Sequence, residues 1–241
     1  MKYAIVGYGG IGKAIDNMAI QRQHQNVAII DQNDHWDLSD AEVVFESTNP
    51  KVCVENLRKL CQAGKNIIVV TTSWYEYLPE ITQLAEENQV RILWSSNFSI
   101  GVNVYYQIIE AASKIMNKVN EYDIWGTEIH HRNKLDSPSG TAKKIEEIIL
   151  HNIDRKTAVI EDKLDRRLEP HEFHFSSTRG GEVNFSHTLS FDSPADCIEI
   201  KHSARNRDGY ALGAVQAAEW LLKQSVGVYT MEDFLHSILN K

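Results

Sequence analysis

The sequence of 241 residues is poor in cysteine and has no long apolar run, and each shortage excludes a class of protein. Its three cysteines, Cys53, Cys61 and Cys197, form no CxxC pair, and three scattered thiols do not build a disulfide framework. No apolar stretch approaches the roughly 20 residues that a membrane-spanning helix needs. We therefore expect a protein of the reducing cytoplasm that has no membrane partner and whose cysteines serve as packing residues.

Positive charge is also scarce, because 25 lysine and arginine residues are set against 33 aspartate and glutamate residues, giving a formal net charge of −8. Such a chain does not attract nucleic acid as a whole, so an anionic ligand needs cations that gather locally. The amino terminus, MKYAIVGYGG, reaches its glycine motif after six residues, which leaves no room for the apolar core of a signal peptide. Apolar residues make up 42% of the chain, which is ordinary for a folded globular protein.

Residues 1–100 alternate short apolar runs with amphipathic segments, as βαβ units do. Continuous apolar strands separated by helices are typical of a parallel sheet that is covered on both faces. The first part of the chain therefore predicts an α/β fold of the Rossmann type, with a doubly wound parallel sheet. The expected strands are Tyr3–Val6, Val27–Ile30, Val43–Phe45, Asn66–Val70 and Arg91–Trp94.

The pattern changes after Gly101, where a long amphipathic helix is followed by a strand-rich region. Residues 171–177, 182–191 and 196–203 show the alternation and the aromatic or β-branched content of strands, and short connections join them. We expect a second α+β domain with an open, mixed and mostly antiparallel sheet, followed by a last helix at 210–223. An open sheet has two faces, so apolar residues in these strands predict a homo-oligomer; they are Phe185, Leu189, Ile198 and Ile200.

A glycine motif follows the first expected strand and opens the first expected helix. Gly7, Gly9 and Gly12 form GxGxxG, a spacing that also occurs in ordinary tight loops. Here bare backbone would let a pyrophosphate approach the amide groups of a helix N-terminus. Asp31 stands at the end of the second strand, where a carboxylate binds ribose hydroxyls. It would repel a 2′-phosphate, and neither Gln32 nor Asn33 offers a cation, so the expected cofactor is NADH, with NADPH as the alternative.

Hydroxyl side chains follow two more strands at the same expected edge of the sheet. Ser47 and Thr48 come after the third strand, and Thr71 and Thr72 come after the fourth. Ligands of doubly wound sheets bind beyond the carboxyl ends of the strands, so these residues are candidate cofactor contacts. Helix caps and turn residues have the same composition, and the sequence leaves both interpretations open.

The string EIHHRNKLDSPSGTA, residues 128–142, carries the candidate chemistry. A histidine by itself is usually structural, but Arg132 and Lys134 add positive charge just before Ser139, which is expected to begin a helix. Helix N-terminal amides with cationic neighbours form a site for a small carboxylate, and an imidazole or ammonium group beside it could supply a proton. No metal site is expected, because His171 and His174 lack a set of further ligands.

This string and the flanking motifs resemble the dihydrodipicolinate reductase family. VGYGGIG resembles its cofactor loop, TTS its nicotinamide-proximal threonines, SSNFSIGVN its entry to the second domain, and EIKHSARNRDGYALGAVQAAEWL its carboxyl-terminal stretch. The family has glycines beside its two threonines, where this chain has Val70 and Ser73.

The resemblance implies reduction of 4-hydroxy-tetrahydrodipicolinate, a small cyclic dicarboxylate, in the diaminopimelate and lysine pathway by a cytoplasmic homotetramer. It also implies a cofactor domain of residues 1–100 with 211–241 around a substrate and oligomerisation domain of 101–210. The implied catalytic residues are His130 and Lys134, and the implied substrate contacts are His131, Ser139, Gly140 and Thr141. The implied cofactor contacts lie at the ends of the strands of the first domain; they are Gly7, Tyr8, Gly9, Gly10, Ile11, Gly12, Asp31, Ser47, Thr48, Thr71, Thr72, Ser73, Ser95, Ser96, Asn97 and Phe98.

Two other functions share parts of this pattern. Another two-domain NAD-dependent oxidoreductase that acts on a small carboxylate would keep the cofactor half, and only the histidine-lysine string separates it from the first interpretation. A non-catalytic NAD(H)-binding sensor would keep the glycine loop and need no proton donor. The presence of His130 and Lys134 disfavours the sensor.

Overall fold

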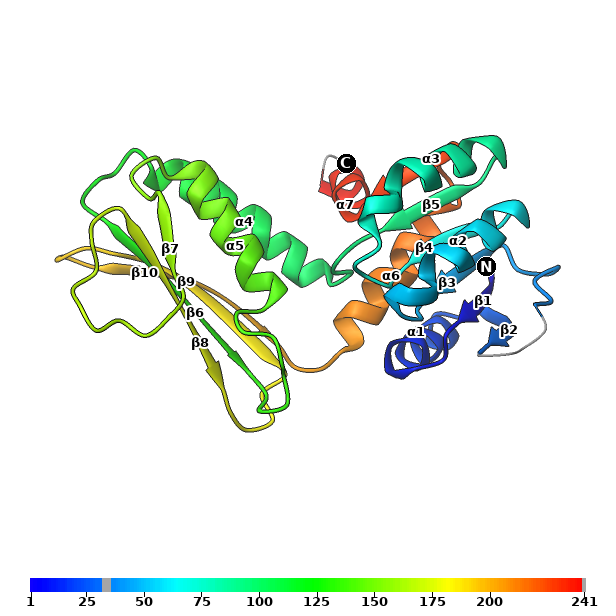
Figure 1. Ribbon diagram of the computed structural model, residues 1–241, viewed down its shortest axis with the longest axis horizontal. Helices are drawn as coiled ribbons and strands as arrows, with labels where there is room; N and C mark the ends of the chain where they lie inside the picture. Colours follow the sequence, from blue (N-terminus) through cyan, green and yellow to red (C-terminus); the bar gives the residue numbers. More distant parts are fainter. Residues whose placement is uncertain (32–35, 240–241) are drawn as a thin grey trace. The chain divides into compact units, whose positions relative to one another are not determined.

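A computed structural model describes residues 1–31 and 36–239, so Gln32 and Asn33 lie outside the described residues. The chain forms two compact units, one of residues 1–100 and 207–241 and the other of residues 101–206 (Figure 1). The second unit ends at residue 206 rather than the expected 210, because the helix that returns to the first unit already begins at Asp208. Among the described residues no helix is both long and apolar enough to span a membrane.

The first unit contains a six-stranded parallel sheet, which confirms the doubly wound fold. Its strand order is β11-β5-β4-β3-β1-β2, so the chain moves from β1 to one side and then to the other. The carboxyl ends of β1 and β3 therefore meet at the switch point where such sheets bind ligands. The strands are β1 (Lys2–Val6), β2 (Gln25–Ile30), β3 (Val43–Glu46), β4 (Asn66–Val69), β5 (Arg91–Trp94) and β11 (Gly227–Thr230).

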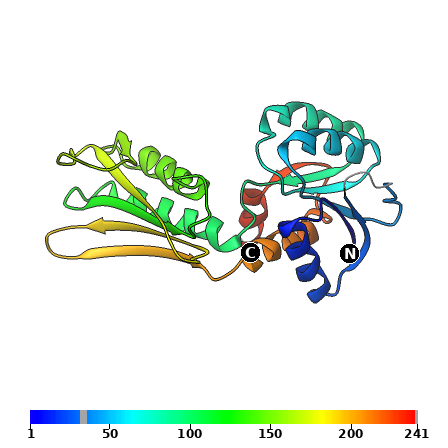
Figure 2. The same ribbon diagram turned by 60° about the horizontal axis from the view of Figure 1, so that its bottom comes forward.

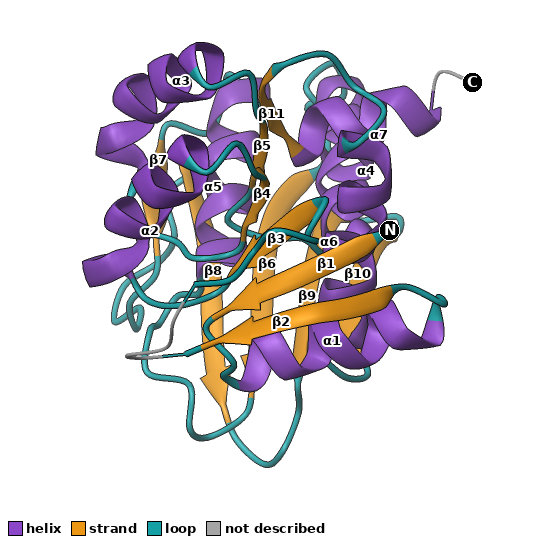
Figure 3. Cartoon of the chain, turned by 90° about the vertical axis from the view of Figure 1, so that its right-hand side faces the viewer, coloured by secondary structure: helices purple, strands orange, loops and turns teal. Residues whose placement is uncertain are grey.

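Helices cover both faces of this sheet, which explains why its strands read as continuous apolar runs. In β1, Tyr3 and Ile5 point to one face and Ala4 and Val6 to the other, and all four are buried. Helices α1 and α6 pack together on one face, and α2 and α3 on the other (Figures 1 and 3). The helices are α1 (Gly10–Gln21), α2 (Pro50–Gln62), α3 (Leu78–Glu87), α6 (Asp208–Leu221) and α7 (Met231–Leu239), with a 3₁₀ turn η1 (Tyr75–Tyr77) before α3.

Helix α6 comes late in the sequence but belongs to the core of the first unit, where it packs against α1, β4 and β5. Gly213 lets it approach the segment after β5, because an added Cβ would lie 1.8 Å from the carbonyl oxygen of Phe98. Tyr210 contacts the ring of the same phenylalanine at 5.7 Å. Strand β11 and helix α7, which the sequence analysis did not predict, complete the unit beside β5 and α6.

The second unit is a five-stranded mixed sheet of order β10-β9-β6-β8-β7. The expected mixed sheet is confirmed, but β6 pairs with β8, and β7 with β8, in parallel, so only the β6–β9 and β9–β10 ladders are antiparallel. The parallel part arises because α5 connects β6 to the β7–β8 pair as a crossover helix does. The elements are α4 (Ile100–Met116), β6 (Asp123–His130), α5 (Gly140–Asn152), β7 (Ala158–Ile160), β8 (Glu172–Arg179), β9 (Phe185–Asp192) and β10 (Cys197–Ala204).

Helices α4 and α5 lie over one face of this sheet and leave the other, here called the open face, without a helix among the described residues (Figure 2). The apolar strand residues named from the sequence all lie on the covered face. Phe185 and Leu189 share the side of β9 that carries buried Phe191, and Ile198 and Ile200 of β10 pair with Phe191 and Leu189. The open face instead carries Trp125 and Ile129 of β6, both 38% exposed, among threonine and serine side chains of β6, β8 and β9.

Candidate active site

The glycine loop between β1 and α1 is built around two glycines that cannot be replaced without a clash. Gly7 has a φ of 90°, and an added Cβ would lie 2.7 Å from the carbonyl oxygen of Ser47. A Cβ on Gly12 would lie 2.4 Å from the carbonyl oxygen of Gly7. Gly7 therefore allows the tight turn after β1, and Gly12 allows α1 to pack closely against that turn, as the GxGxxG motif of dinucleotide-binding proteins requires.

The other two glycines of the loop leave space for a ligand. A Cβ on Gly9 would meet nothing within 4 Å, and one on Gly10 would meet only the Nη1 atom of Arg207 at 3.5 Å. Gly9 caps α1 without a side-chain hydrogen bond, so the first amide groups of the helix keep their capacity to bind an anion. The exposed guanidinium group of Arg207, just before α6, adds a positive charge beside them. This open cradle fits the pyrophosphate of a dinucleotide.

Three other expected cofactor residues, in the loop and directly after β3, form hydrogen bonds within the protein around the cradle. Tyr8 donates a hydrogen bond of 2.5 Å to the carboxylate of Asp16, which draws the tyrosine hydroxyl back toward α1. Ser47 donates its hydroxyl hydrogen to the carbonyl oxygen of Gly7 at 2.6 Å. Thr48 donates to the buried carboxylate of Glu46. The hydroxyl groups of Tyr8, Ser47 and Thr48 therefore all donate hydrogen bonds to other groups of the protein.

The remaining expected cofactor residues follow β2, β4 and β5 at the carboxyl edge of the sheet, as predicted. Exposed Asp31 comes directly after β2, and Thr72 and Ser73 are exposed after β4. Ser73 has a φ of 62°, which explains why the family has glycine at this position. Ile11, the second residue of α1, is half-buried, and Thr71 is buried. Ser95, Ser96 and Asn97 form the turn after β5, and Phe98 is fully buried.

In the second unit, strand register assembles a cluster of side chains at the end of β6. Glu128 and His130 are two residues apart and so share a face of the strand. On the antiparallel neighbour β9, His187 lies directly opposite Glu128. On the parallel neighbour β8, Ser177 pairs with Glu128 and Arg179 pairs with His130. The covered face therefore carries a polar cluster at its edge.

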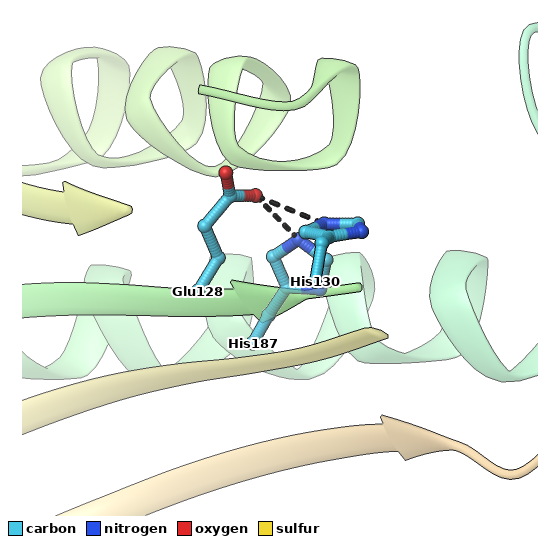
Figure 4. A group of neighbouring side chains, drawn as sticks. All are labelled: Glu128, His130 and His187. Atoms are coloured by element: carbon cyan, nitrogen blue, oxygen red, sulfur yellow. Dashed lines mark hydrogen bonds and ion pairs between the residues drawn. The ribbon is translucent and has the colours of Figure 1, made fainter. Parts of the chain in front are cut away.

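The Glu128 carboxylate is the centre of this cluster and is fully buried (Figure 4). Its Oε1 atom accepts hydrogen bonds from the Ser139 amide at 3.0 Å, the Ser177 hydroxyl at 2.9 Å and Arg179 Nη2 at 2.8 Å. Its Oε2 atom accepts from the Ser139 hydroxyl and faces Nε2 of His187 at 3.1 Å and of His130 at 3.2 Å.

Glu128, His130 and His187 lie close enough together to suggest a metal site, with ligand atoms within 4.8 Å of one another. Both carboxylate oxygens are already occupied by hydrogen-bond donors, and the Arg179 guanidinium lies 2.8 Å from Oε1, where it would repel a cation. The arrangement therefore fits a hydrogen-bonded network better than a metal centre.

Burial and the hydrogen bonds of this network shift the pKa values of Glu128 and His130. Burial alone would raise the pKa of Glu128, but hydrogen bonds from His187, Ser139, Arg179 and Ser177 outweigh it and hold that pKa well below its usual range. Burial lowers the pKa of His130 to about 4, because the opposing attraction of Glu128 is weaker and His187, Lys134 and Arg179 also disfavour a positive charge. At neutral pH the cluster holds an ionised carboxylate and an uncharged His130.

The expected substrate residues lie between His130 and the first turn of α5. Ser139 caps this helix, accepting a hydrogen bond from the Ala142 amide at 3.1 Å, and is itself buried. Gly140 is exposed and a Cβ there would meet nothing within 4 Å, while Thr141 and His131 are half-buried. Lys134 keeps a partly exposed ammonium group that pairs with Asp136 at 2.8 Å. An ammonium, an imidazole and an open helix N-terminus thus lie along one short segment.

Four residues of these sites, Glu128, Arg179, His187 and Arg207, were not predicted from the sequence. The spacing of Glu128 and His130 places them on one face of a strand, and a histidine at an inward position of an alternating strand, such as His187, marks a polar site in the core. The position of Arg207 beside Gly10 depends on the return of α6 to the first unit, which no local pattern reveals.

Comparisons with known proteins agree on one family. The family model for the N-terminus of dihydrodipicolinate reductase matches residues 1–98, and the model for its C-terminus matches residues 101–235. A 4-hydroxy-tetrahydrodipicolinate reductase of Christiangramia forsetii is 32% identical over 241 residues, covering 99% of both chains. One of Archaeoglobus fulgidus is 37% identical over 201 residues, covering 81% of this chain and 76% of the relative.

Solved structures show the same fold. A dipicolinate-bound dihydrodipicolinate reductase from Paenisporosarcina sp. TG-14 superposes with a TM-score of 0.76 at 19% identity and covers 95% of this chain and 97% of its own. An amine dehydrogenase from Mycobacterium smegmatis reaches a TM-score of 0.54 at 10% identity, covering 95% and 94%. The architecture is therefore shared with oxidoreductases that act on other substrates.

Proposed function

The chain belongs to the dihydrodipicolinate reductase family, and we propose that it catalyses the NAD(P)H-dependent reduction of 4-hydroxy-tetrahydrodipicolinate to tetrahydrodipicolinate in diaminopimelate and lysine biosynthesis. The observation that carries this proposal is the segment in which His130 and Lys134 precede the open first turn of α5. A silent NAD(H) sensor has no need of such a segment.

The cofactor is held by the glycine loop of the first unit. The amide groups at the start of α1 and the Arg207 guanidinium bind its pyrophosphate, and Asp31 binds the adenosine ribose. Residues 71–73 and 95–98, after β4 and β5, extend along the same sheet edge toward the nicotinamide. When bound, the reduced nicotinamide supplies a hydride.

The substrate is a small cyclic dicarboxylate, and the second unit supplies its charge and its proton. The α5 N-terminus, with Gly140 and Thr141, receives one carboxylate, and His131 adds a further polar contact. The 4-hydroxyl group leaves as water, which gives the conjugated ring of dihydrodipicolinate. Hydride transfer to that ring leaves an electron-rich enamine, which must gain a proton before product leaves. Lys134 donates that proton, and His130 acts as the acid-base group beside it.

The decisive assay follows NADH oxidation with the freshly made product of dihydrodipicolinate synthase. We expect turnover with NADH to be more efficient than with NADPH, because the Asp31 carboxylate repels a 2′-phosphate. Measuring kcat/KM for both cofactors in the wild type and in Asp31→Ala checks this prediction. The variant should lose efficiency with NADH more than with NADPH. A strong NADPH preference in the wild type would show that a cation elsewhere overrides Asp31, and no turnover with either would overturn the proposed reaction.

We further propose that the enzyme is a cytoplasmic homotetramer assembled through the open face. Cys53, Cys61 and Cys197 are all free thiols, as a reducing compartment allows. Trp125 and Ile129 form the apolar centre of the open face, and the serine and threonine side chains around them can exchange hydrogen bonds with a second copy.

Trp125→Glu is expected to dissociate the oligomer, because it places a charge at the centre of a self-complementary interface. Light scattering of dilute wild type and variant measures the mass of each. Ile108→Glu, on a half-exposed position of α4 on the covered side, is the matched control and should leave the mass unchanged. A wild type that stays monomeric would mean that the open face has another use.

A further inference from the structure

Glu128 has no part in the function proposed above, yet its carboxylate faces the histidine to which that function assigns acid-base work (Figure 4). Resting on that function, we propose that Glu128 is the positioning residue for His130: it accepts the hydrogen of Nε2 and leaves Nδ1 as the ring nitrogen that exchanges a proton at the substrate site.

The donors around Glu128 require it to be ionised. Three groups donate to Oε1, namely the Ser139 amide, the Ser177 hydroxyl and the Arg179 guanidinium. Oε2 accepts from the Ser139 hydroxyl and faces both imidazoles. A protonated carboxyl group would have to donate its hydrogen to an imidazole nitrogen, but the positive charge of Arg179 at 2.8 Å and the hydrogens donated by Ser139 and Ser177 stabilise the ionised form instead. The carboxylate is therefore an acceptor at both oxygens.

An ionised carboxylate decides the tautomer of the histidine beside it. The His130 Nε2 atom lies 3.2 Å from Oε2 and can form a hydrogen bond only if Nε2 carries the hydrogen. In uncharged His130 the lone pair then lies on Nδ1. Stacking on Phe185, with ring centroids 5.8 Å apart, adds a second restraint on the ring.

The second nitrogen of His130 points away from Glu128, toward the end of β6 (Figure 4). Protonation there gives an imidazolium that donates from Nδ1. When it acts as an acid, the Nδ1–H bond breaks and its electron pair returns to nitrogen, while the amine that Lys134 becomes after protonating the enamine forms an N–H bond with its own pair. The negative charge of Glu128 stabilises the imidazolium that exists before this transfer, as a buried carboxylate does for a catalytic histidine.

His187 also contacts the Glu128 carboxylate, but its position suits it to fixing that carboxylate rather than to proton transfer with a ligand. It is fully buried, its Nε2 lies between Glu128 Oε2 and the Ser139 hydroxyl at 3.1 Å from each, and its Nδ1 atom is buried without a partner. His130, at the end of the strand, is the imidazole that the open segment of residues 131–138 adjoins.

The wild-type protein tests the tautomer directly, without any variant of Glu128. Nitrogen-15 NMR distinguishes a ring nitrogen that carries hydrogen from one that does not, and His130→Gln identifies the signals. We expect the His130 signals to show hydrogen on Nε2 and a bare Nδ1 at neutral pH. Hydrogen on Nδ1 instead would overturn the proposal, whatever reaction the enzyme catalyses.

Kinetics of Glu128→Gln test the consequence for catalysis. The amide keeps the shape but loses the charge, so we expect kcat to fall by roughly 10- to 100-fold, with less than about a threefold change in either KM. The pKa of His130 should fall further below its value of about 4 in the wild type, because Glu128 is the group that raises it against burial, His187, Lys134 and Arg179. A merely structural substitution would leave that titration unchanged.

Glu172→Gln is the matched control, since it removes another buried carboxylate of the same unit from its ion pair with Arg166 and lies outside the cluster. It should leave kcat and the His130 titration unchanged. If kcat is normal in Glu128→Gln but lowered in His130→Ala, Glu128 is not a positioning residue, and the proposed function still stands. An inactive wild type would reject the proposed function, and the NMR result would still decide the tautomer.

Discussion

Lys134→Ala is expected to lower kcat by roughly 100-fold or more, the usual scale for the loss of a general acid. The ammonium group lies in the segment between His130 and the first turn of α5, is partly exposed and is held by Asp136 at 2.8 Å. Because burial leaves His130 uncharged at neutral pH, our proposal assigns the donated proton to Lys134. Steady-state kinetics at saturating substrate measure the effect.

The split between kcat and KM separates proton donation from electrostatic binding. Loss of a donor lowers kcat with little change in KM, whereas loss of a carboxylate contact mainly raises KM when chemistry is slow. His130→Ala should resemble Lys134→Ala, and Thr141→Ala should chiefly raise KM. Lys144→Ala, which removes an exposed ammonium group paired with Glu147 on α5, is the control and should behave as wild type. Normal kcat in both Lys134→Ala and His130→Ala would leave these residues as binding contacts only.

Gly213→Ala is expected to destabilise the first unit by about 3 kcal/mol or more, at the upper end of overpacking effects. The added Cβ would lie 1.8 Å from the carbonyl oxygen of Phe98 and 2.9 Å from its carbonyl carbon, both of them backbone atoms that cannot rotate away. Either α6 or the segment after β5 must move. Thermal unfolding should show a midpoint lower by roughly 6 to 12 °C.

The same helix supplies the control for this variant. Gly209 also lies in α6, but a Cβ there would meet Ser99 Oγ at an ordinary 3.8 Å. Gly209→Ala should therefore leave the midpoint unchanged or raise it slightly through helix propensity. Equal midpoints for the two variants would mean that α6 yields to the extra methyl group without cost.

Local patterns predicted residues 1–100 of the first unit well, because the central strands β1, β3, β4 and β5 are largely buried on both faces and their apolar runs are continuous. The glycine loop was predictable because Gly7 and Gly12 are required by backbone geometry that any such turn shares. The parallel pairing of β6 with β8 could not be predicted from the sequence. The alternation of apolar and polar residues in a strand shows which side chains face the core, but not which strand lies beside it.

The residues of the polar cluster were also hard to predict, because some of them come together only through strand pairing. His130 and Lys134 stand out because they are close in sequence to the start of α5. Arg179 and His187 lie 51 and 59 residues beyond Glu128 in the sequence and reach it only through the register of β8 and β9. Even with every strand correctly predicted, a register shifted by one residue would turn His187 to the open face.

The return of α6 to the first unit sets an order on folding during synthesis. Residues 101–206 form a continuous unit that is complete before α6 has been made, whereas residues 1–100 lack the helix that covers α1, β4 and β5. Chains usually fold their N-terminal domain first as they are synthesised. Residues 1–100 are made before the second unit and gain α6 only after it, so the apolar surface that α6 covers stays open to misassembly until α6 has been made.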